Sequence, residues 1–259
     1  VSFGMNAETD LENVPEIAVV VPTHNEAENV GPLISEIIAA LSKHSFEIIF
    51  VDDGSSDGTA EALASAGARH PELRVVTHSL ACGQSTAIVS GVRAAKADII
   101  VTMDGDGQND PADATALIDH YEEAGGGDKL MITGHRVNRR DTCLRRISSR
   151  IANGIRGGLL GDATPDAGCG LKVFSRRAFL EMPAFDHMHR FLPAMMIRAG
   201  GNVLSVPVNH RSRTWGTSKY GVWNRLWVGI IDLFGVIWLI RRAANPASVE
   251  RNEKQRDAS

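Results

Sequence analysis

Two aspartates, Asp104 and Asp106, are separated by a single glycine, and Gln108 follows two residues later. Carboxylate and amide oxygens are the ligands that hard divalent cations prefer, and Mg²⁺ often binds through one or two carboxylates together with substrate phosphates. The pattern therefore predicts a site for Mg²⁺ or Mn²⁺ carrying a diphosphate. Because Asp-Gly-Asp also forms ordinary turns, the prediction depends on where this segment lies in the fold.

A second acidic segment, DDGSSDGT at 52–59, does not fit a calcium loop. An EF-hand loop beginning at Asp53 needs a bidentate glutamate at its twelfth position, and Ala64 occupies that position. The glycine patterns of dinucleotide and P-loop sites, G-x-G-x-x-G and G-x-x-x-x-G-K-[ST], are absent from the sequence.

Strand-like and helix-like segments alternate through the first half of the chain. Short apolar runs predict strands at 17–21, 46–51, 73–77, 98–103 and 130–133. Apolar residues at helical spacing predict helices over about 27–43, 57–69 and 85–96, and a further one that begins at Asp110-Pro111 and ends at Gly125. This alternation predicts an α/β fold, with a mostly parallel sheet and helices on both faces.

Polar segments follow three of these strands: PTHNEAEN at 22–29, DDGSSDGT at 52–59 and DGDGQNDP at 104–111. In parallel sheets the ligand crevice lies beyond the carboxyl ends of the strands. One such loop could be a capping turn, but three at the same edge predict a binding site.

The composition narrows the class of protein. The chain has 259 residues, 43% of them hydrophobic and 22% charged, which excludes disordered and collagen-like classes and allows one large domain or two small ones. The three cysteines have no C-x-x-C spacing, which argues against a disulfide scaffold or a cysteine-ligated zinc site. Residues 1–16 lack the basic and apolar runs of a signal peptide, so a cytoplasmic setting is expected.

Charge is distributed unevenly. Residues 1–110 contain 5 Lys or Arg against 17 Asp or Glu, whereas residues 111–259 contain 22 against 14. The acidic part suits a cation, and the basic part suits phosphates or an anionic membrane. Seven arginines and a single acidic residue, Asp141, lie within 136–156: Arg136, Arg139, Arg140, Arg145, Arg146, Arg150 and Arg156. Arginine binds phosphate through a planar fork. A solvated helix face or one lying on anionic lipid is the alternative, and nucleic acid is not expected because aromatic residues are not interleaved.

Taken together, these motifs resemble the inverting family-2 glycosyltransferases with the GT-A fold. The superfamily motifs are PTHNE, VDDGSSDGT and DGDGQNDP, and four later segments resemble polyprenyl-phosphate sugar synthases: RRISSRIAN (145–153), DAGCGLKVFSR (166–176), HRFLPA (189–194) and RTWGTSKYG (213–221). The resemblance covers about residues 16–242. It implies a Rossmann-like, mostly parallel sheet and transfer of a sugar from a nucleotide donor to a polyprenyl phosphate.

The resemblance also implies roles for individual residues. The nucleoside of the donor would be held by Pro22, Thr23, Glu26, Asp52 and Asp53. Asp104, Asp106 and Gln108 would hold Mg²⁺ or Mn²⁺ on the diphosphate, with Asp104 also contacting the donor. Arg136 would lie near the sugar and phosphates, Arg145 and Ser149 would cradle the acceptor phosphate, and Arg213, Ser218 and Lys219 would belong to a mobile loop that closes over the phosphates.

The resemblance is compatible with several sugar-nucleotide donors. GDP-mannose is favoured by the resemblance, and UDP-glucose, UDP-N-acetylglucosamine or a UDP-uronic acid remain open. His24 stands where relatives often have tyrosine, and Gly83-Gln84-Ser85 departs from the frequent Gly-Lys-Gly or Gly-Leu-Gly run; both bear on base and sugar identity. Two other functions also remain: transfer to a polysaccharide hydroxyl, with Asp166 as the general base, and a non-catalytic sugar-nucleotide binder.

All four tryptophans fall near the end of the chain, among basic residues: Trp215, Trp223, Trp227 and Trp238. The apolar run at 226–240 is about 22 Å long as a helix, short of a hydrocarbon core of about 30 Å, and Asp232 interrupts it. We expect amphipathic helices at the membrane interface, and a peripheral protein on the cytoplasmic face. A buried or dimer-forming helix is the alternative, so a homo-oligomer stays open. The expected domains are a flexible 1–15, a glycosyltransferase domain 16–210, a loop and interfacial helices 211–242, and a polar tail 243–259.

Overall fold

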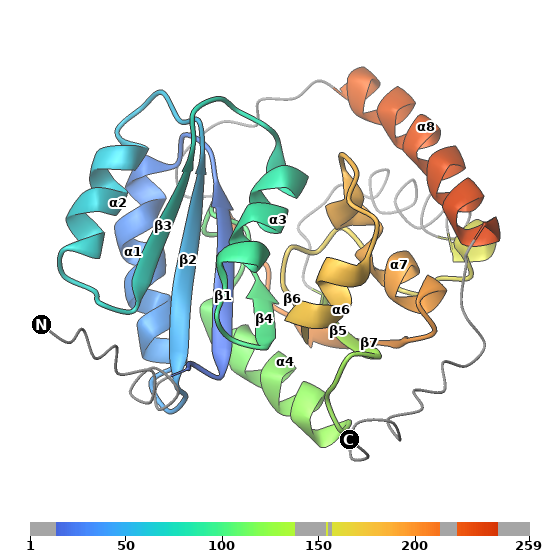
Figure 1. Cartoon of the computed structure of the whole chain (residues 1–259), viewed down its shortest axis with the longest axis horizontal. Coiled ribbons are helices and arrows are strands. Elements are labelled where there is room, and N and C mark those ends of the chain that lie inside the picture. Colours follow the sequence, from blue (N-terminus) through green and yellow to red (C-terminus); the bar gives the residue numbers. More distant parts are fainter. Residues whose placement is uncertain (1–13, 138–153, 155–156, 213–221, 243–259) are drawn as a thin grey trace, which may run out of the picture.

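The computed structural model describes residues 14–137, 154, 157–212 and 222–242, and these form a sheet flanked by helices (Figure 1). The strands are β1 (Ile17–Thr23), β2 (Phe46–Asp53), β3 (Leu73–His78), β4 (Ile99–Thr102), β5 (Leu130–Arg136), β6 (Lys172–Ser175) and β7 (Asn202–Val208). The helices are α1 (Ala27–Ala40), α2 (Thr59–Gly67), α3 (Gln84–Ala94), α4 (Pro111–Glu123), α6 (Arg176–Glu181), α7 (Leu192–Arg198) and α8 (Val222–Arg241), with a 3₁₀ turn, η1, at Met188–Arg190.

The sheet is mostly parallel, as expected. Its seven strands run in the order β3-β2-β1-β4-β6-β5-β7. All neighbouring pairs are parallel except those of β6, which is antiparallel to both β4 and β5. The strand order reverses between β1 and β4, and at such a point the loops diverge and leave a crevice. The fold class predicted from the sequence is confirmed.

Two apolar clusters cover the two faces of the sheet, because successive side chains of a strand point to opposite faces. Val19 and Val21 of β1 pack in one cluster with α1, α2 and α4. Ala18 and Val20 of the same strand pack in the other, with α3, α6 and α7. Strands buried on both faces read as continuous apolar runs, which is why β1 was recognisable from the sequence.

Several helix ends differ from the sequence expectation by a few residues. Helix α4 begins as predicted, because the Asp110 side chain accepts a hydrogen bond from the Ala112 N–H and Pro111 occupies the first helical position. Helix α2 starts at Thr59 rather than at Asp57, since the Asp57 carboxylate accepts hydrogen bonds from the N–H and hydroxyl of Thr59 before the helix begins.

A buried carboxylate, Glu47, joins three segments at the amino end of the sheet. Its Oε1 accepts hydrogen bonds from the backbone N–H groups of Lys96 (2.6 Å) and Ala97 (3.1 Å), and its Oε2 accepts one from Arg74 (2.8 Å). Replacing Glu47 by alanine leaves two backbone donors without their acceptor. We expect the free energy of unfolding to fall by about 2–4 kcal/mol, measured by chemical denaturation. The control is Glu123→Ala, which removes an exposed carboxylate and should change stability by less than about 0.5 kcal/mol; equal losses in the two variants would contradict the assignment.

Candidate active site

The polar loops that follow β1, β2 and β4 meet at the carboxyl edge of the sheet. Thr23 at the end of β1 pairs in register with Asp52 of β2, and β4 lies on the other side of β1. A Cβ placed on Gly105 would come within 2.9 Å of the Thr23 hydroxyl, so the loop after β4 packs directly on the end of β1. The structure thus brings together acidic residues from segments about 50 residues apart in the sequence.

Asp104 lies half-buried at the centre of this edge. Its Oδ1 accepts a hydrogen bond of 2.8 Å from the Gln84 side chain. Gly170 lies so close that a Cβ there would overlap the Asp104 carboxylate. Burial, followed by the negative charge of Asp106, raises the pKa of Asp104 to about 6.

This arrangement fits a hard divalent cation. Two carboxylates from one loop disfavour each other's charged form, and a bound cation would relieve that repulsion with the oxygen donors that Mg²⁺ and Mn²⁺ accept. Asp106 accepts a hydrogen bond from the Gln108 N–H (3.1 Å), which folds the loop back on itself. The Gln108 side-chain amide lies 3.5 Å from the carbonyl oxygen of Arg211. Whether Gln108 is a ligand therefore stays a prediction.

Arg211 attaches the start of the predicted mobile loop to the acidic edge. Its guanidinium lies 2.6 Å from Glu36 and 2.8 Å from Asp110, and its N–H donates to the carbonyl of Gln108. Residues 213–221, which include the predicted Arg213 and Lys219, lie outside the described residues. Arg145 and Ser149 do so too. The roles given to these four residues stay predictions.

Two basic side chains, Arg136 and Lys172, lie close enough to Asp104 to lower its pKa by their charge. The guanidinium of Arg136, at the end of β5, forms a bidentate pair with Asp166, with N···O distances of 2.6 and 2.7 Å. Lys172 at the start of β6 is only 3% exposed and its ammonium donates to the carbonyl of Cys169. Burial lowers the pKa of Lys172, although the charges of Asp104 and Asp166 oppose that shift. Basic groups therefore lie next to the Asp104 carboxylate, with Asp166 balancing the charge of Arg136.

Asp166 cannot easily serve as a general base in this arrangement. Both of its oxygens accept hydrogen bonds from the Arg136 guanidinium, and Oδ2 also lies 3.3 Å from the Arg136 backbone N–H. A carboxylate whose lone pairs are shared with a guanidinium is a poor proton acceptor. This geometry counts against the hydroxyl-acceptor hypothesis.

The loops after β1 and β2 are joined by hydrogen bonds. The N–H of Asn25, at a positive φ of 57°, donates to the hydroxyl of Ser55, and the Asn25 side chain accepts from the N–H of Ser56. The N–H of Glu26 donates to the Thr59 hydroxyl, while the Glu26 carboxylate accepts from Asn29. The predicted nucleoside-binding residues therefore lie close together: Pro22 and Thr23 end β1, Asp52 and Asp53 end β2, and Glu26 lies in the loop after β1.

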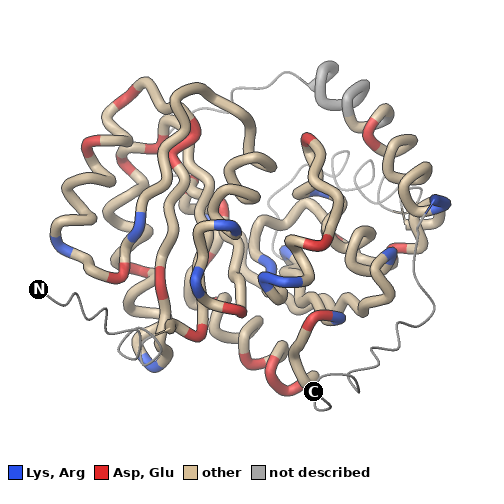
Figure 2. The backbone as a smooth tube through the Cα atoms, viewed as in Figure 1, with Lys and Arg blue, Asp and Glu red and all other residues tan. Residues whose placement is uncertain are grey.

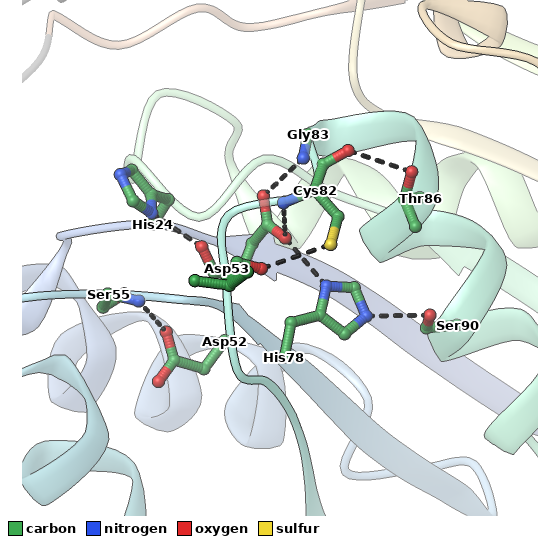
Figure 3. A network of polar contacts seen from close by, with 10 residues as sticks. His24, Asp52, Asp53, Ser55, His78, Cys82, Gly83, Thr86 and Ser90 are labelled. Atoms are coloured by element: carbon green, nitrogen blue, oxygen red, sulfur yellow. Dashed lines mark hydrogen bonds and ion pairs between the residues drawn. The ribbon is translucent and has the colours of Figure 1, made fainter.

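The carboxylate of Asp53 accepts several hydrogen bonds (Figure 3). It accepts hydrogen bonds from the N–H groups of Cys82 (2.8 Å) and Gly83 (2.7 Å) and from His78 Nδ1 (2.7 Å). Burial alone would raise the pKa of Asp53, but these three hydrogen bonds outweigh it and hold the pKa below its ordinary value. Asp52, by contrast, accepts only the N–H of Ser55 (3.1 Å) among the contacts seen in the described chain.

The sequence analysis assigned no contact at the site to Gln84, His78, Lys172 or His189. Gln84, Lys172 and His189 lie in segments compared with the family, and His78 follows the predicted strand at 73–77, but the contact each makes depends on the fold. His189 of HRFLPA, for example, receives a 2.8 Å hydrogen bond at Nδ1 from Ser85 at the start of α3. Burial, then the charges of Arg190 and Lys172, lower the pKa of His189 to about 3, so its imidazole is neutral. No residue pattern available in the sequence identifies such long-range partners.

Helix α8 lies at the opposite end of the molecule from α1 and α2 (Figure 1). Val236 is buried in the second apolar cluster, and Leu233, Ile237 and Ile240 pack against it. The other face carries exposed apolar side chains: Ile231 (68%), Phe234 (68%) and Trp238 (60%). Within the part of the chain that the structure describes, no helix combines the length and apolarity needed to span a membrane. Figure 2 shows few Lys and Arg over the first half of the fold, as the sequence count indicated.

The fold and the acidic edge of the sheet define a class of protein. The family model for glycosyl transferase family 2 matches residues 18–182, and the chain belongs to that family. The chain is 35% identical over 237 residues to a dodecaprenyl-phosphate galacturonate synthase of Rhizobium johnstonii, covering 89% of this chain and 69% of the relative. It is 33% identical over 218 residues to an undecaprenyl-phosphate 4-deoxy-4-formamido-L-arabinose transferase of Edwardsiella ictaluri, covering 83% and 66%. The chain thus spans about two thirds of the length of these relatives, and its resemblance to polyprenyl-phosphate sugar synthases is confirmed.

Solved structures share the fold at lower identity. A mannosyltransferase from Pyrobaculum calidifontis, in complex with GDP-Man and Mn²⁺, aligns with a TM-score of 0.63 and 22% identity over 90% of this chain and 66% of that one. A glucosyl-3-phosphoglycerate synthase from Mycobacterium tuberculosis, in complex with Mn²⁺, UDP and glucosyl-3-phosphoglycerate, aligns with a TM-score of 0.60 and 19% identity over 90% and 82%. Both confirm the GT-A architecture.

Proposed function

We propose that the protein transfers a sugar from a nucleotide-sugar donor to a polyprenyl phosphate, with Mg²⁺ or Mn²⁺ as cofactor. The observation that carries the proposal is that Asp104 and Asp106 lie at one edge of the sheet together with two basic side chains, Arg136 and Lys172, whose charges lower the pKa of Asp104. Carboxylates suit a metal on the donor diphosphate, and cations suit the phosphates that must approach each other. The two relatives' names supply the polyprenyl-phosphate acceptor.

Each group of residues at the site would have its own role in binding. Pro22, Thr23, Glu26, Asp52 and Asp53 would hold the nucleoside, and Asp104, Asp106 and Gln108 the metal. Arg145 and Ser149 would bind the acceptor phosphate, while Arg213 and Lys219 would close over the phosphates. When bound, the metal would stabilise the departing nucleoside diphosphate as a Lewis acid.

The acceptor explains why no strong general base is needed. A phosphate monoester is largely ionised at neutral pH, so its oxygen is already a nucleophile, unlike that of a hydroxyl acceptor. Asp166 is held by Arg136 and does not have to remove a proton. We infer in-line attack on the anomeric carbon with inversion, with Arg136 next to the developing charge. Transfer to a polysaccharide hydroxyl and simple sugar-nucleotide binding are the alternatives.

For the donor we propose a nucleotide-linked uronic acid first and GDP-mannose second. The sequence motifs favoured GDP-mannose at the level of the family. The Rhizobium relative, named for galacturonate, is 35% identical over most of this chain and gives a more specific indication. A sugar carboxylate would also suit a site that contains the basic side chains of Arg136 and Lys172.

Activity is tested with purified protein, Mn²⁺ or Mg²⁺, a short polyprenyl phosphate in detergent, and one labelled nucleotide sugar at a time. We expect one sugar to become extractable into organic solvent, with the product lost when EDTA is added. Product formation that persists in EDTA would contradict the metal assignment. If no sugar transfers to lipid but one transfers to a saccharide acceptor, the hydroxyl hypothesis replaces ours.

We further propose that the protein works at the cytoplasmic face of the membrane as a peripheral protein. The exposed apolar face of α8 supports this, because Ile231, Phe234 and Trp238 could insert into the membrane interface. The exposed Arg241 and Arg242 at the end of the helix would be attracted to anionic lipid headgroups. Such a position would place the site near a lipid-borne phosphate.

A further inference from the structure

His78 lies between a strand and a helix, with both ring nitrogens occupied (Figure 3). Nδ1 lies 2.7 Å from Asp53 Oδ1, and Nε2 lies 2.9 Å from the hydroxyl of Ser90 on α3. The pKa of Asp53 is lowered, so its carboxylate is charged and accepts the proton of Nδ1. Nε2 then accepts the Ser90 hydroxyl proton, which fixes the ring on both sides.

The segment that Asp53 holds is the connection from β3 to α3. Besides His78, the carboxylate binds the N–H groups of Cys82 and Gly83, the last two residues before α3. Gly83 has a φ of +90°, and the turn at Gly54 (φ +64°) contacts Leu80 and Ala81 so closely that no side chain would fit there. The connection from β3 to α3 is therefore held against the end of β2 by hydrogen bonds and by direct backbone contact.

The first residue of α3 reaches the metal-binding carboxylates. Gln84 directly follows Gly83, and its Nε2 donates to Asp104 Oδ1 at 2.8 Å. The order of contacts is therefore His78 to Asp53, Asp53 to Gly83, and Gln84 to Asp104. A change in the position of Gly83 would therefore move Gln84, the residue that orients Asp104.

We propose that His78 is a positioning residue. Through its hydrogen bond to Asp53 it fixes the position of the 80–83 connection, so that Gln84 holds Asp104 in place for the metal and the donor diphosphate. The inference rests on the proposed function for its kinetic consequence, but not for its structural one. It assigns Asp53 a structural task that its three hydrogen bonds already perform.

A metal centre at the same place is the competing explanation. Ligand atoms of Asp53, His78 and Cys82 lie within 4.8 Å of one another. However, both Asp53 oxygens already accept hydrogen bonds, and the Cys82 thiol lies 3.2 Å from the carbonyl of Leu80. A cation would have to displace those donors. The hydrogen-bonded arrangement therefore needs no ion.

Hydrogen exchange tests the positioning directly and requires no activity. In His78→Ala, the amides of Cys82 and Gly83 should exchange at least about tenfold faster, because Asp53 loses its side-chain donor. His78→Asn should restore slow exchange, since the asparagine Nδ2 occupies the place of Nδ1. The matched control is His70→Ala, which removes a histidine paired with Glu72 at the other end of β3. Unchanged exchange in His78→Ala, or rapid exchange that His78→Asn does not slow, would overturn the proposal.

Kinetics then test the link to Asp104. His78→Ala should raise the donor KM and the half-saturating Mn²⁺ concentration by about tenfold, with kcat changed less. Gln84→Ala should raise the same two constants, and the double variant should show no further increase, because both changes break one chain of contacts. Additive effects, or a fall in kcat alone, would overturn it. Zn²⁺ that slows exchange of the wild-type amides and is not bound by His78→Asn would favour the metal centre instead.

Failure of the two proposals is distinguishable. If the protein transfers no sugar, the exchange measurements still report whether His78 seats the connection. If transfer occurs but the amides of Cys82 and Gly83 do not respond to His78→Ala, the proposed function stands and the positioning role falls.

Discussion

Changing Asp106 to alanine should reduce turnover by at least about 10³-fold without unfolding the protein. Asp106 lies in the loop after β4, where its carboxylate accepts the Gln108 N–H. Its loss leaves Asp104 as the only carboxylate of the D-x-D pair. Removing a metal ligand forfeits several kcal/mol of transition-state stabilisation, and each 1.4 kcal/mol is a factor of ten in rate. Initial rates are measured over a range of Mn²⁺ concentrations.

The control for this variant is Asp98→Asn. Asp98 is an exposed carboxylate just before β4, at the end of the strand remote from the site, so the variant changes net charge by the same amount. It should keep full activity, and both variants should melt within a few degrees of the wild type. Robust turnover by Asp106→Ala at low Mn²⁺ would refute the metal site and, with it, the assigned mechanism.

The central part of the fold was predictable because its physical signals are local. β1 and β2 are buried on both faces, so each appears as an unbroken apolar run. The amino end of α4 was predictable from Asp110-Pro111, where capping depends on two neighbouring residues only.

The strands at one side of the sheet gave no such signal. β6 has four residues and begins with a buried lysine, Lys172, whose side-chain nitrogen donates to the carbonyl of Cys169 and whose pKa is lowered by burial and raised by the charges of Asp104 and Asp166. β7 is the edge strand of the sheet and contains Pro207, which normally argues against a strand but is allowed at an edge. Both depend on tertiary context that the sequence does not display.

At the candidate site, too, some residues could be placed from the sequence and others could not. The position of Asp104, Asp106 and Asp53 followed from a general property of parallel sheets, whose strand ends share one edge. Their partners did not follow, because Gln84, Gly170 and Lys172 approach Asp104 from segments that are distant in sequence. The arginine and the serine predicted for the acceptor phosphate, Arg145 and Ser149, lie outside the described residues, and their roles stay predictions.

Replacing Ile231, Phe234 and Trp238 together by serine should reduce binding to anionic vesicles by about 100-fold or more. These side chains are 68%, 68% and 60% exposed and lie on one side of α8, whereas Val236 faces the protein. Full burial of such a side chain stabilises by about 1.5–3 kcal/mol, so even partial insertion of three side chains exceeds the 2.8 kcal/mol or so that 100-fold requires. Binding is measured by co-sedimentation with phosphatidylcholine vesicles with and without phosphatidylglycerol.

The comparison of two further variants separates the apolar contribution from the electrostatic one. Arg241→Gln with Arg242→Gln should weaken binding only to vesicles that contain phosphatidylglycerol, because each basic residue near an anionic surface contributes about 1 kcal/mol. Leu204→Ser alters an exposed apolar residue on β7, far from α8 in sequence, and should leave binding unchanged. If the triple variant binds vesicles as well as the wild type but changes the oligomeric state, the exposed face of α8 joins two copies of the chain rather than a bilayer. Loss of vesicle binding with an unchanged oligomeric state would instead place the active site at the lipid surface, because α8 packs through Val236 on the same domain that carries Asp104.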